Sequence, residues 1–208
     1  DKNQSIWIAQ REGRAKDGFD KTAPGLLKMF GMASDGNLLE HLISLNITPV
    51  SLSYELDPCD GLKIPELLKK AAGEEYVKAK GEDEMNMGLG IRGHKGNVHI
   101  QFGTSINDKI KGLSHIKNRN ELLKNIAAII DKEIYLNYRL WNSNYVAYDL
   151  LHTSTKYVEK YDVGGKETFE SYMDEKLGSL KGNAEAKKIF LLMYANPVLN
   201  AEIALETV

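Results

Sequence analysis

The sequence predicts an α/β fold, in which a mixed sheet is flanked by helices and is followed by an all-helical C-terminal extension. Residues 1–115 contain 14 of the 18 glycines and four of the five prolines, and these residue types mark turns between short elements. Residues 116–208 contain eight of the ten tyrosines and carry apolar residues at helical spacing. Residues 5–9 are apolar on both faces, as in a central strand that helices cover on each side. We therefore expect an α/β domain over residues 1–115 and a helical extension over residues 116–208.

Helix and strand patterns alternate in the first part. Val50, Leu52 and Tyr54 share one face at the period of a strand. Pro49 lacks an N–H donor, so it belongs at the beginning or the edge of this strand. In chain order, the pattern predicts a strand at 5–9, helices at 26–32 and 38–45, a strand at 47–54, a helix at 60–80, and a hairpin with strands at 87–92 and 97–103.

The second part has helix signals at both ends of its elements. Asn118 and Glu121 resemble a capping pair, and apolar residues follow at helical spacing. A second amphipathic helix includes residues 169–180. Asn183 can cap a third helix, which Pro197 should end or kink.

Composition restricts the class of protein. The chain of 208 residues has a net charge of −2 and 42% hydrophobic residues, which is ordinary for a globular protein and gives no general attraction to nucleic acid. Its single cysteine, Cys59, cannot form an internal disulfide and favours a reducing compartment. The longest charge-free stretch is shorter than the roughly 20 apolar residues that span a bilayer. Because the chain opens at Asp1 without a methionine, we expect a fragment of a longer protein.

A loop rich in basic residues follows the predicted strand at 5–9. Arg11, Arg14 and Lys16 alternate with Gly13 and Gly18 in this loop. Arginine can hold a phosphate through two hydrogen bonds, lysine adds a point charge, and glycine lets the backbone approach a ligand. The loop is therefore either an anion-binding site or a solvated charged loop.

Two sequence blocks carry a resemblance to a known family. The first is the apolar segment followed by Glu12-Gly13-Arg14 and Lys16-Asp17-Gly18, and the second runs from Ile47 through Pro49 to Glu55. In this order and spacing they resemble the third and fourth conserved blocks of the glycerol-3-phosphate and 1-acylglycerol-3-phosphate acyltransferases. The resemblance covers residues 4–105, and no motif accounts for the remainder.

The resemblance implies transfer of a fatty acyl group from acyl-CoA or acyl carrier protein to the hydroxyl of a glycerophosphate. The family's third block binds the acceptor phosphate. Its usual Glu-Gly-Gly-Arg or Glu-Gly-Thr-Arg run is one residue shorter here, so either Glu12 or Arg11 occupies the glutamate's place. The implied substrate-binding residues are Arg11, Glu12, Gly13, Arg14, Lys16 and Pro49, with Val50 and Leu52 near the acyl chain. We expect no cofactor beyond the acyl donor, no metal, a cytoplasmic location and a peripheral contact with the inner face of the membrane.

The catalytic base of this family is a histidine with an aspartate five positions later, which orients the imidazole for proton removal. None of the five histidines, His41, His94, His99, His115 and His152, is followed by an aspartate at that spacing. We therefore expect the parent protein to be an acyltransferase and this chain alone to be inactive. The alternative is a non-catalytic α/β module that binds an anionic ligand or partner through the loop at residues 11–16.

Three further patterns favour structural roles. Residues 88–93 match the glycine spacing of dinucleotide sites, but that motif needs a preceding strand and a following helix. Cys59 lies between two carboxylates and has no base beside it, so we expect the thiol to be unreactive. The aromatic stretch at 135–148 is typical of core packing, with a membrane-interface belt as the alternative.

Overall fold

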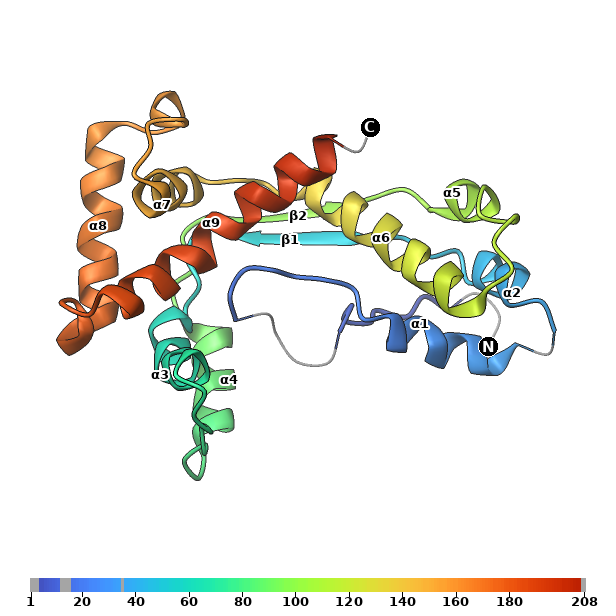
Figure 1. Ribbon diagram of the computed structural model, residues 1–208, viewed down its shortest axis with the longest axis horizontal. Helices are drawn as coiled ribbons and strands as arrows, with labels where there is room; N and C mark the ends of the chain where they lie inside the picture. Colours follow the sequence, from blue (N-terminus) through green and yellow to red (C-terminus); the bar gives the residue numbers. More distant parts are fainter. Residues whose placement is uncertain (1–3, 12–15, 35, 207–208) are drawn as a thin grey trace. The chain divides into compact units, whose positions relative to one another are not determined.

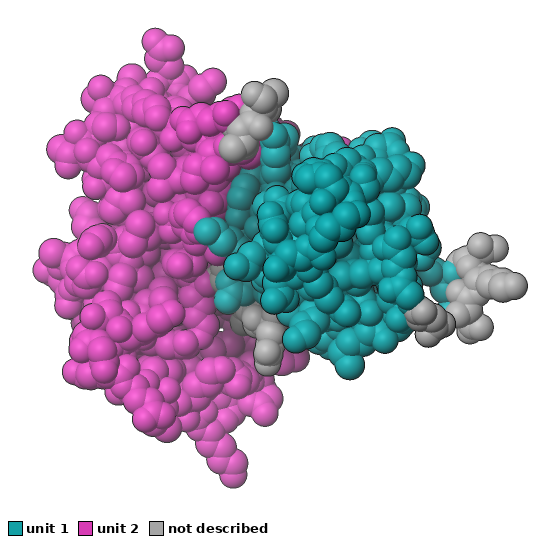
Figure 2. All heavy atoms as spheres, turned by 45° about the vertical axis from the view of Figure 1, so that its right-hand side comes forward, with its two compact units in different colours: residues 1–14, 20–50, 102–137 teal, residues 15–19, 51–101, 138–208 magenta. Residues whose placement is uncertain are grey.

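The protein forms two compact units that interleave along the chain. The computed structural model describes residues 4–11, 16–34 and 36–206. Unit 1 consists of residues 1–14, 20–50 and 102–137, and unit 2 of residues 15–19, 51–101 and 138–208 (Figure 2). The predicted mixed α/β fold is wrong, because the structure is 60% helical and has one antiparallel sheet of two strands.

Unit 1 is built from helices that surround one apolar core. Its elements are α1 (Pro24–Phe30), the 3₁₀ turn η1 (Gly31–Ala33), α2 (Leu38–Ser44), α5 (Asn107–Lys111) and α6 (Arg119–Asn137) (Figure 1). The predicted cap of α6 is confirmed, since the Asn118 side chain accepts hydrogen bonds from the backbone N–H groups of Asn120 and Glu121. Leu122, Ile126 and Ile130 of α6 are buried at the predicted spacing. They pack with Leu27, Leu42, Ile106, Ile110, Leu123 and Ala127.

Helices of unit 2 pack around α9. Its helical elements are α3 (Asp60–Ala71), α4 (Glu82–Arg92), α7 (Asn142–His152), η2 (Val158–Lys160), α8 (Val163–Leu177), η3 (Gly178–Leu180) and α9 (Ala184–Glu206). Helices α3, α7 and α8 all contact α9 (Figure 1). Phe169, Phe190 and Tyr194 form an aromatic cluster with ring centroids 5.2–6.1 Å apart. The predicted amphipathic pattern of α8 is confirmed by the burial of Phe169, Met173 and Leu177.

Pro197, predicted to end or kink the third helix, lies inside α9 and does not end it. Its Asn183 cap is confirmed, because the side chain accepts from the N–H groups of Glu185 and Ala186. The helix nevertheless continues past Pro197 to Glu206. Burial of Tyr194 and Val198 around the proline offsets the lost hydrogen bond.

Among the described helices, α9 alone has the length and mean hydropathy of a membrane span, but 56% of that stretch is buried, as in the core helix of a folded unit.

The sheet pairs β1 (Val50–Tyr54) with β2 (Val98–Phe102). Backbone bonds from Gly103 N to Pro49 O and from Glu55 N to Asn97 O, both 2.9 Å, set Leu52 opposite Ile100. The predicted strand period is confirmed, and the apolar side of the sheet is the exposed one: Ile100 is 52% exposed, whereas Ser51 and Ser53 on the opposite side are buried.

Two predicted strands are absent. Residues 5–9 have no regular structure, and Ile6 and Trp7 are 80% and 66% exposed. An apolar segment becomes a strand only when another strand pairs with its backbone, and the sheet of the described residues contains only β1 and β2. Residues 87–92 belong to helix α4, so the predicted hairpin is wrong. The acidic first turn of α4, at residues 82–84, favours a helix N-terminus and outweighs the glycines that follow.

Candidate functional site

The predicted anion-binding loop is described only at its two ends. Arg11, in unit 1, is partly buried, and Lys16 belongs to unit 2. Glu12, Gly13 and Arg14 lie outside the described residues. The structure therefore leaves the proposed phosphate contacts of the first block as predictions.

Lys16 forms an ion pair with Glu66 of α3, and about one third of each side chain is exposed. A partly exposed ion pair of this kind contributes little to stability. An anion that reaches Lys16 must compete with the Glu66 carboxylate. Glu66 consequently determines how strongly this lysine can bind a phosphate.

Residues 16–18 are held against α9 by two buried asparagines. Asn196 donates to the Asp17 carbonyl at 2.6 Å, and Asn200 donates to the Gly18 carbonyl at 3.3 Å. Gly18 has φ +74°, and a Cβ there would lie 2.3 Å from the Met193 carbonyl oxygen. Glycine is therefore required at position 18 for both conformation and close approach. This anchoring gives the backbone beside Lys16 a fixed position on a helix.

Pro49 lies at the beginning of the strand, as its missing N–H donor predicts. It is buried directly before β1, and its carbonyl accepts from Gly103 N at 2.9 Å. Its carbonyl thus contributes to strand pairing. Its predicted role near an acyl chain stays a prediction.

The buried side of the sheet carries polar groups that the sequence analysis did not select as a site. Ser53 Oγ accepts from Arg139 N at 2.9 Å. Ser51 Oγ and His99 Nδ1 are buried and have no hydrogen-bond partner within the described part of the chain. His99 points away from the apolar face, as its alternation with Val98 and Ile100 predicts. The alternation of serine with apolar residues in β1 could have indicated a polar face of the strand.

A buried carboxylate in unit 2 was also missed. Asp60, fully buried at the start of α3, accepts from Tyr194 Oη at 2.6 Å, Tyr172 Oη at 2.8 Å and Gly61 N at 2.6 Å. Burial raises the pKa of the Asp60 carboxyl, and the three hydrogen bonds only partly oppose this effect. Since no surface of Asp60 is exposed, it cannot touch a substrate from solvent. It joins α3 to α8 and α9.

The histidines do not form a catalytic base with a carboxylate. His41 Nε2 lies 3.1 Å from the Phe30 carbonyl oxygen, and His115 Nδ1 lies 3.0 Å from that of Gly112. The His152 ring packs on Tyr148 with centroids 4.4 Å apart. In the ranges 4–11, 16–34 and 36–206, no histidine forms an ion pair within 4 Å of an acidic side chain, and no three His, Cys, Asp or Glu residues are placed to hold a metal.

Cys59 and the glycine motif have structural surroundings. Cys59 is buried, and its Sγ lies 3.5 Å from the Asn86 carbonyl oxygen. The glycines at 88–93 lie within α4 and at its end, so they form no phosphate loop between a strand and a helix. The dinucleotide motif therefore lacks the structural context that it requires.

A groove runs between α3 and α4 within unit 2. Its volume is about 380 Å³. Its walls come from α3 (Gly61, Leu62, Pro65), the connection (Tyr76, Ala79, Lys80, Gly81) and α4 (Glu82, Met85, Asn86).

Comparisons with known proteins give no relative for this chain. No family model, no curated protein and no solved structure matches it. The functional argument therefore depends on the sequence blocks and on the geometry described above.

Proposed function

We propose that this chain supplies the acceptor-phosphate site of an acyltransferase that uses acyl-CoA or acyl carrier protein as donor and a glycerophosphate as acceptor. Support comes first from the two sequence blocks around Arg14 and Pro49, in the order and spacing of the acyltransferase family. The structural observation that carries the proposal is the anchoring of residues 16–18 on α9. A backbone fixed in this way holds the Lys16 charge near one position, as phosphate recognition requires.

The reaction needs a base that this chain does not supply. The acceptor hydroxyl oxygen attacks the thioester carbonyl carbon, the base takes the hydroxyl proton, and the carrier leaves as a thiolate with the electrons of the broken C–S bond. In our proposal a His-x-x-x-x-Asp run outside these 208 residues is the base. The role of this chain is to bind and orient the acceptor.

The role of Lys16 can be tested by measuring sn-glycerol 3-phosphate binding to the 208-residue chain by isothermal titration calorimetry. Lys16→Ala should weaken binding roughly 10- to 150-fold, because a lost charge-assisted hydrogen bond costs about 1.5–3 kcal/mol of binding free energy. Glu66→Gln should tighten binding, because the competing carboxylate is removed. Lys187→Ala, an exposed lysine of α9, is the matched control. Unchanged binding in Lys16→Ala, or weaker binding in Glu66→Gln, contradicts the proposal.

The second candidate is a non-catalytic module that binds an anionic ligand. The observation that favours it is the lack of a histidine–carboxylate ion pair in the described part of the chain. A version of the protein that includes the proposed His-x-x-x-x-Asp run separates the two candidates. Acyl transfer by that version supports the enzyme, whereas anion binding without turnover supports the module.

A further inference from the structure

Residues 5–9 form an exposed apolar segment, which we call the apolar arm. Isoleucine and tryptophan have high strand propensity, and Ile6, Trp7 and Ile8 are 80%, 66% and 47% exposed. Gln10, directly after the arm, is anchored in unit 1, because its carbonyl accepts from the backbone N–H at the N-cap of α1 at 2.9 Å. The arm therefore starts from a fixed point of unit 1, and its apolar side chains contact water.

Strand β1 has an open edge. In the described part of the chain the sheet contains only β1 and β2, so no further strand lies along the outer edge of β1. The hydrogen bond from Glu55 N to Asn97 O shows that the backbone groups of odd-numbered β1 residues face β2. By alternation, the N–H and C=O groups of Leu52 face away from β2. Such an edge is a template for another strand, and two strands alone are marginally stable in water.

The exposed side of the sheet matches the apolar arm in character. Leu52 and Ile100 lie opposite each other and are 39% and 52% exposed, and Val98, two positions from Ile100, is 48% exposed. Ile6 and Ile8 are also two positions apart, so both would lie on one face of an added strand. Beside Leu52 they would extend the apolar face and remove part of it from water.

We propose that two copies of this chain associate by exchanging their apolar arms, each arm adding a third strand to the open edge of β1 in the other copy. The occupant of the edge is a second copy because every copy carries both an unpaired arm and an open edge, each five residues long. Reciprocal exchange closes as a symmetric dimer. Main-chain hydrogen bonds hold the added strand, and the isoleucines set its register.

The expected dimer is weak and reversible. Each copy contributes one short strand, which makes a small contact. The net charge of −2 opposes self-association only weakly. The inference goes beyond the proposed acyltransferase function and does not depend on the phosphate site.

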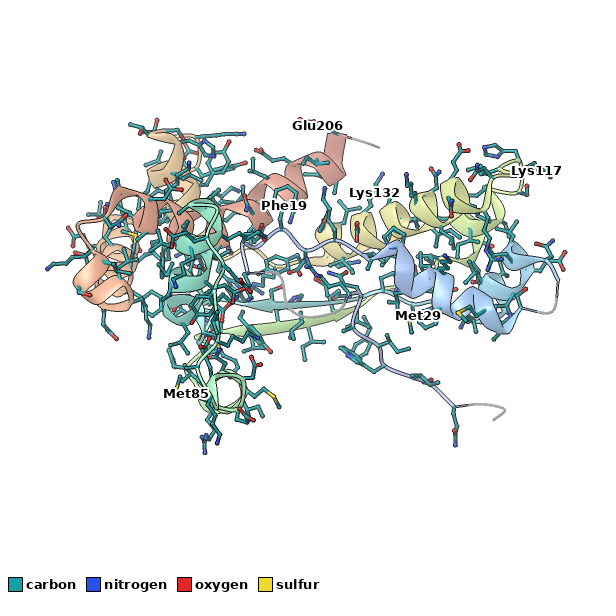
Figure 3. All side chains as sticks on the ribbon, turned by 60° about the horizontal axis from the view of Figure 1, so that its bottom comes forward. Phe19, Met29, Met85, Lys117, Lys132 and Glu206 are labelled. Carbon is teal, nitrogen blue, oxygen red and sulfur yellow. The ribbon has the colours of Figure 1, made fainter. Side chains whose placement is uncertain are left out.

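The arm is tested by sedimentation velocity of the 208-residue chain between about 1 µM and about 1 mM, where we expect a monomer–dimer equilibrium. Ile8→Asp should weaken association at least about 100-fold, because each dimer loses two buried side chains that contribute about tenfold or more each. Met29→Asp is the matched control. Met29 of α1, labelled in Figure 3, is 65% exposed and belongs to the same unit as the arm, so this variant should associate like the parent.

The edge is tested with proline, which cannot donate a backbone hydrogen bond. Leu52→Pro removes an N–H that faces away from β2, so it should abolish the dimer while β1 stays paired with β2. Ile100→Pro, at the opposite position on the outer edge of β2, is the control and should keep the dimer. If Leu52→Pro does not fold by circular dichroism, Leu52→Lys tests the same point by placing a charge on the apolar face.

Mixing two variants separates arm exchange from other forms of association. Ile8→Asp keeps an intact edge and Leu52→Pro keeps an intact arm, so the mixture should form a heterodimer through one exchanged arm although each variant alone is monomeric. A parent chain that stays monomeric up to about 1 mM overturns the proposal, as does an equal loss of association in Ile8→Asp and Met29→Asp. Loss of the dimer in Ile100→Pro but not in Leu52→Pro would place the arm on β2 and would also overturn it.

Discussion

Replacing Asp60 by asparagine should remove a pH dependence of stability in unit 2. The pKa of the Asp60 carboxyl is raised by burial in the folded protein, with a smaller contribution from the charge of Asp57. Between the ordinary aspartate pKa of about 3.9 and the raised folded pKa, the unfolded chain binds fewer protons than the folded one. Stability contributed by the protonated group is therefore fully present below about pH 3.9 and is lost as the pH rises through the folded pKa.

The magnitude follows from the proton difference between the two states. Each pH unit within this window should lower the free energy of unfolding by up to about 1.4 kcal/mol. The asparagine side chain of the variant cannot ionise, and it still offers an acceptor to Tyr172 or Tyr194. The free energy of unfolding of the parent minus that of Asp60→Asn should therefore fall with rising pH and become constant above the folded pKa.

The assay is urea unfolding between pH 4 and pH 8, followed by fluorescence. Trp7 belongs to unit 1 and Trp141 to unit 2, so a Trp7→Phe background makes the signal specific for unit 2. Tyr194→Phe removes a hydrogen bond that lowers the pKa of Asp60 and should extend the window to higher pH. A difference that stays flat would mean that folding does not shift the pKa of Asp60, and one that rises with pH would mean that the charged form is stabilised; either result would refute the reasoning.

Four further substitutions test the packing and the site. Gly18→Ala should destabilise unit 2 by about 1–3 kcal/mol, since alanine is strained at φ +74° and its Cβ would meet the Met193 carbonyl; an unchanged urea midpoint would contradict the anchoring. Asn118→Ala should cost unit 1 about 1 kcal/mol through loss of the α6 cap, and Asn118→Asp, which keeps the acceptor, is its control. Phe190→Ala should cost about 3–5 kcal/mol, because the ring is fully buried; a smaller change in thermal unfolding would mean that the core collapses around the cavity. In a version that supplies the base, Arg14→Ala should lower kcat/KM for the acceptor roughly 10- to 150-fold, and a loss confined to the donor would contradict its assignment.

Local signals predicted two helix N-termini. The caps of α6 and α9 were found from Asn118 and Asn183, because a capping side chain bonds backbone groups only two or three residues away. Position 197 shows the limit of local rules: the proline removes one hydrogen bond, and burial of the surrounding α9 residues decides that the helix continues.

Nonlocal features were predicted less well. Residues 5–9 have the composition of a central strand, but a strand forms only with a paired neighbour, which composition cannot supply. The alternation of apolar residues with serine in β1 predicted which side chains share a face of the strand. It did not predict which face is buried, because that depends on the elements that pack against each face. Asp60 could not be identified as a buried carboxylate because Tyr172 and Tyr194 are more than 100 residues away along the chain.

The position of α9 has a consequence for biosynthesis. Asn196 bonds the carbonyl of Asp17, 179 residues earlier. At roughly 5–20 residues per second, translation separates these two groups by roughly 9–36 s. All residues of unit 1 are synthesised by Asn137, so its core can close first. The helices α3, α7 and α8 keep the apolar side chains that pack on α9 exposed until α9 leaves the ribosome. During this interval the emerging polypeptide is open to chaperones and to aggregation.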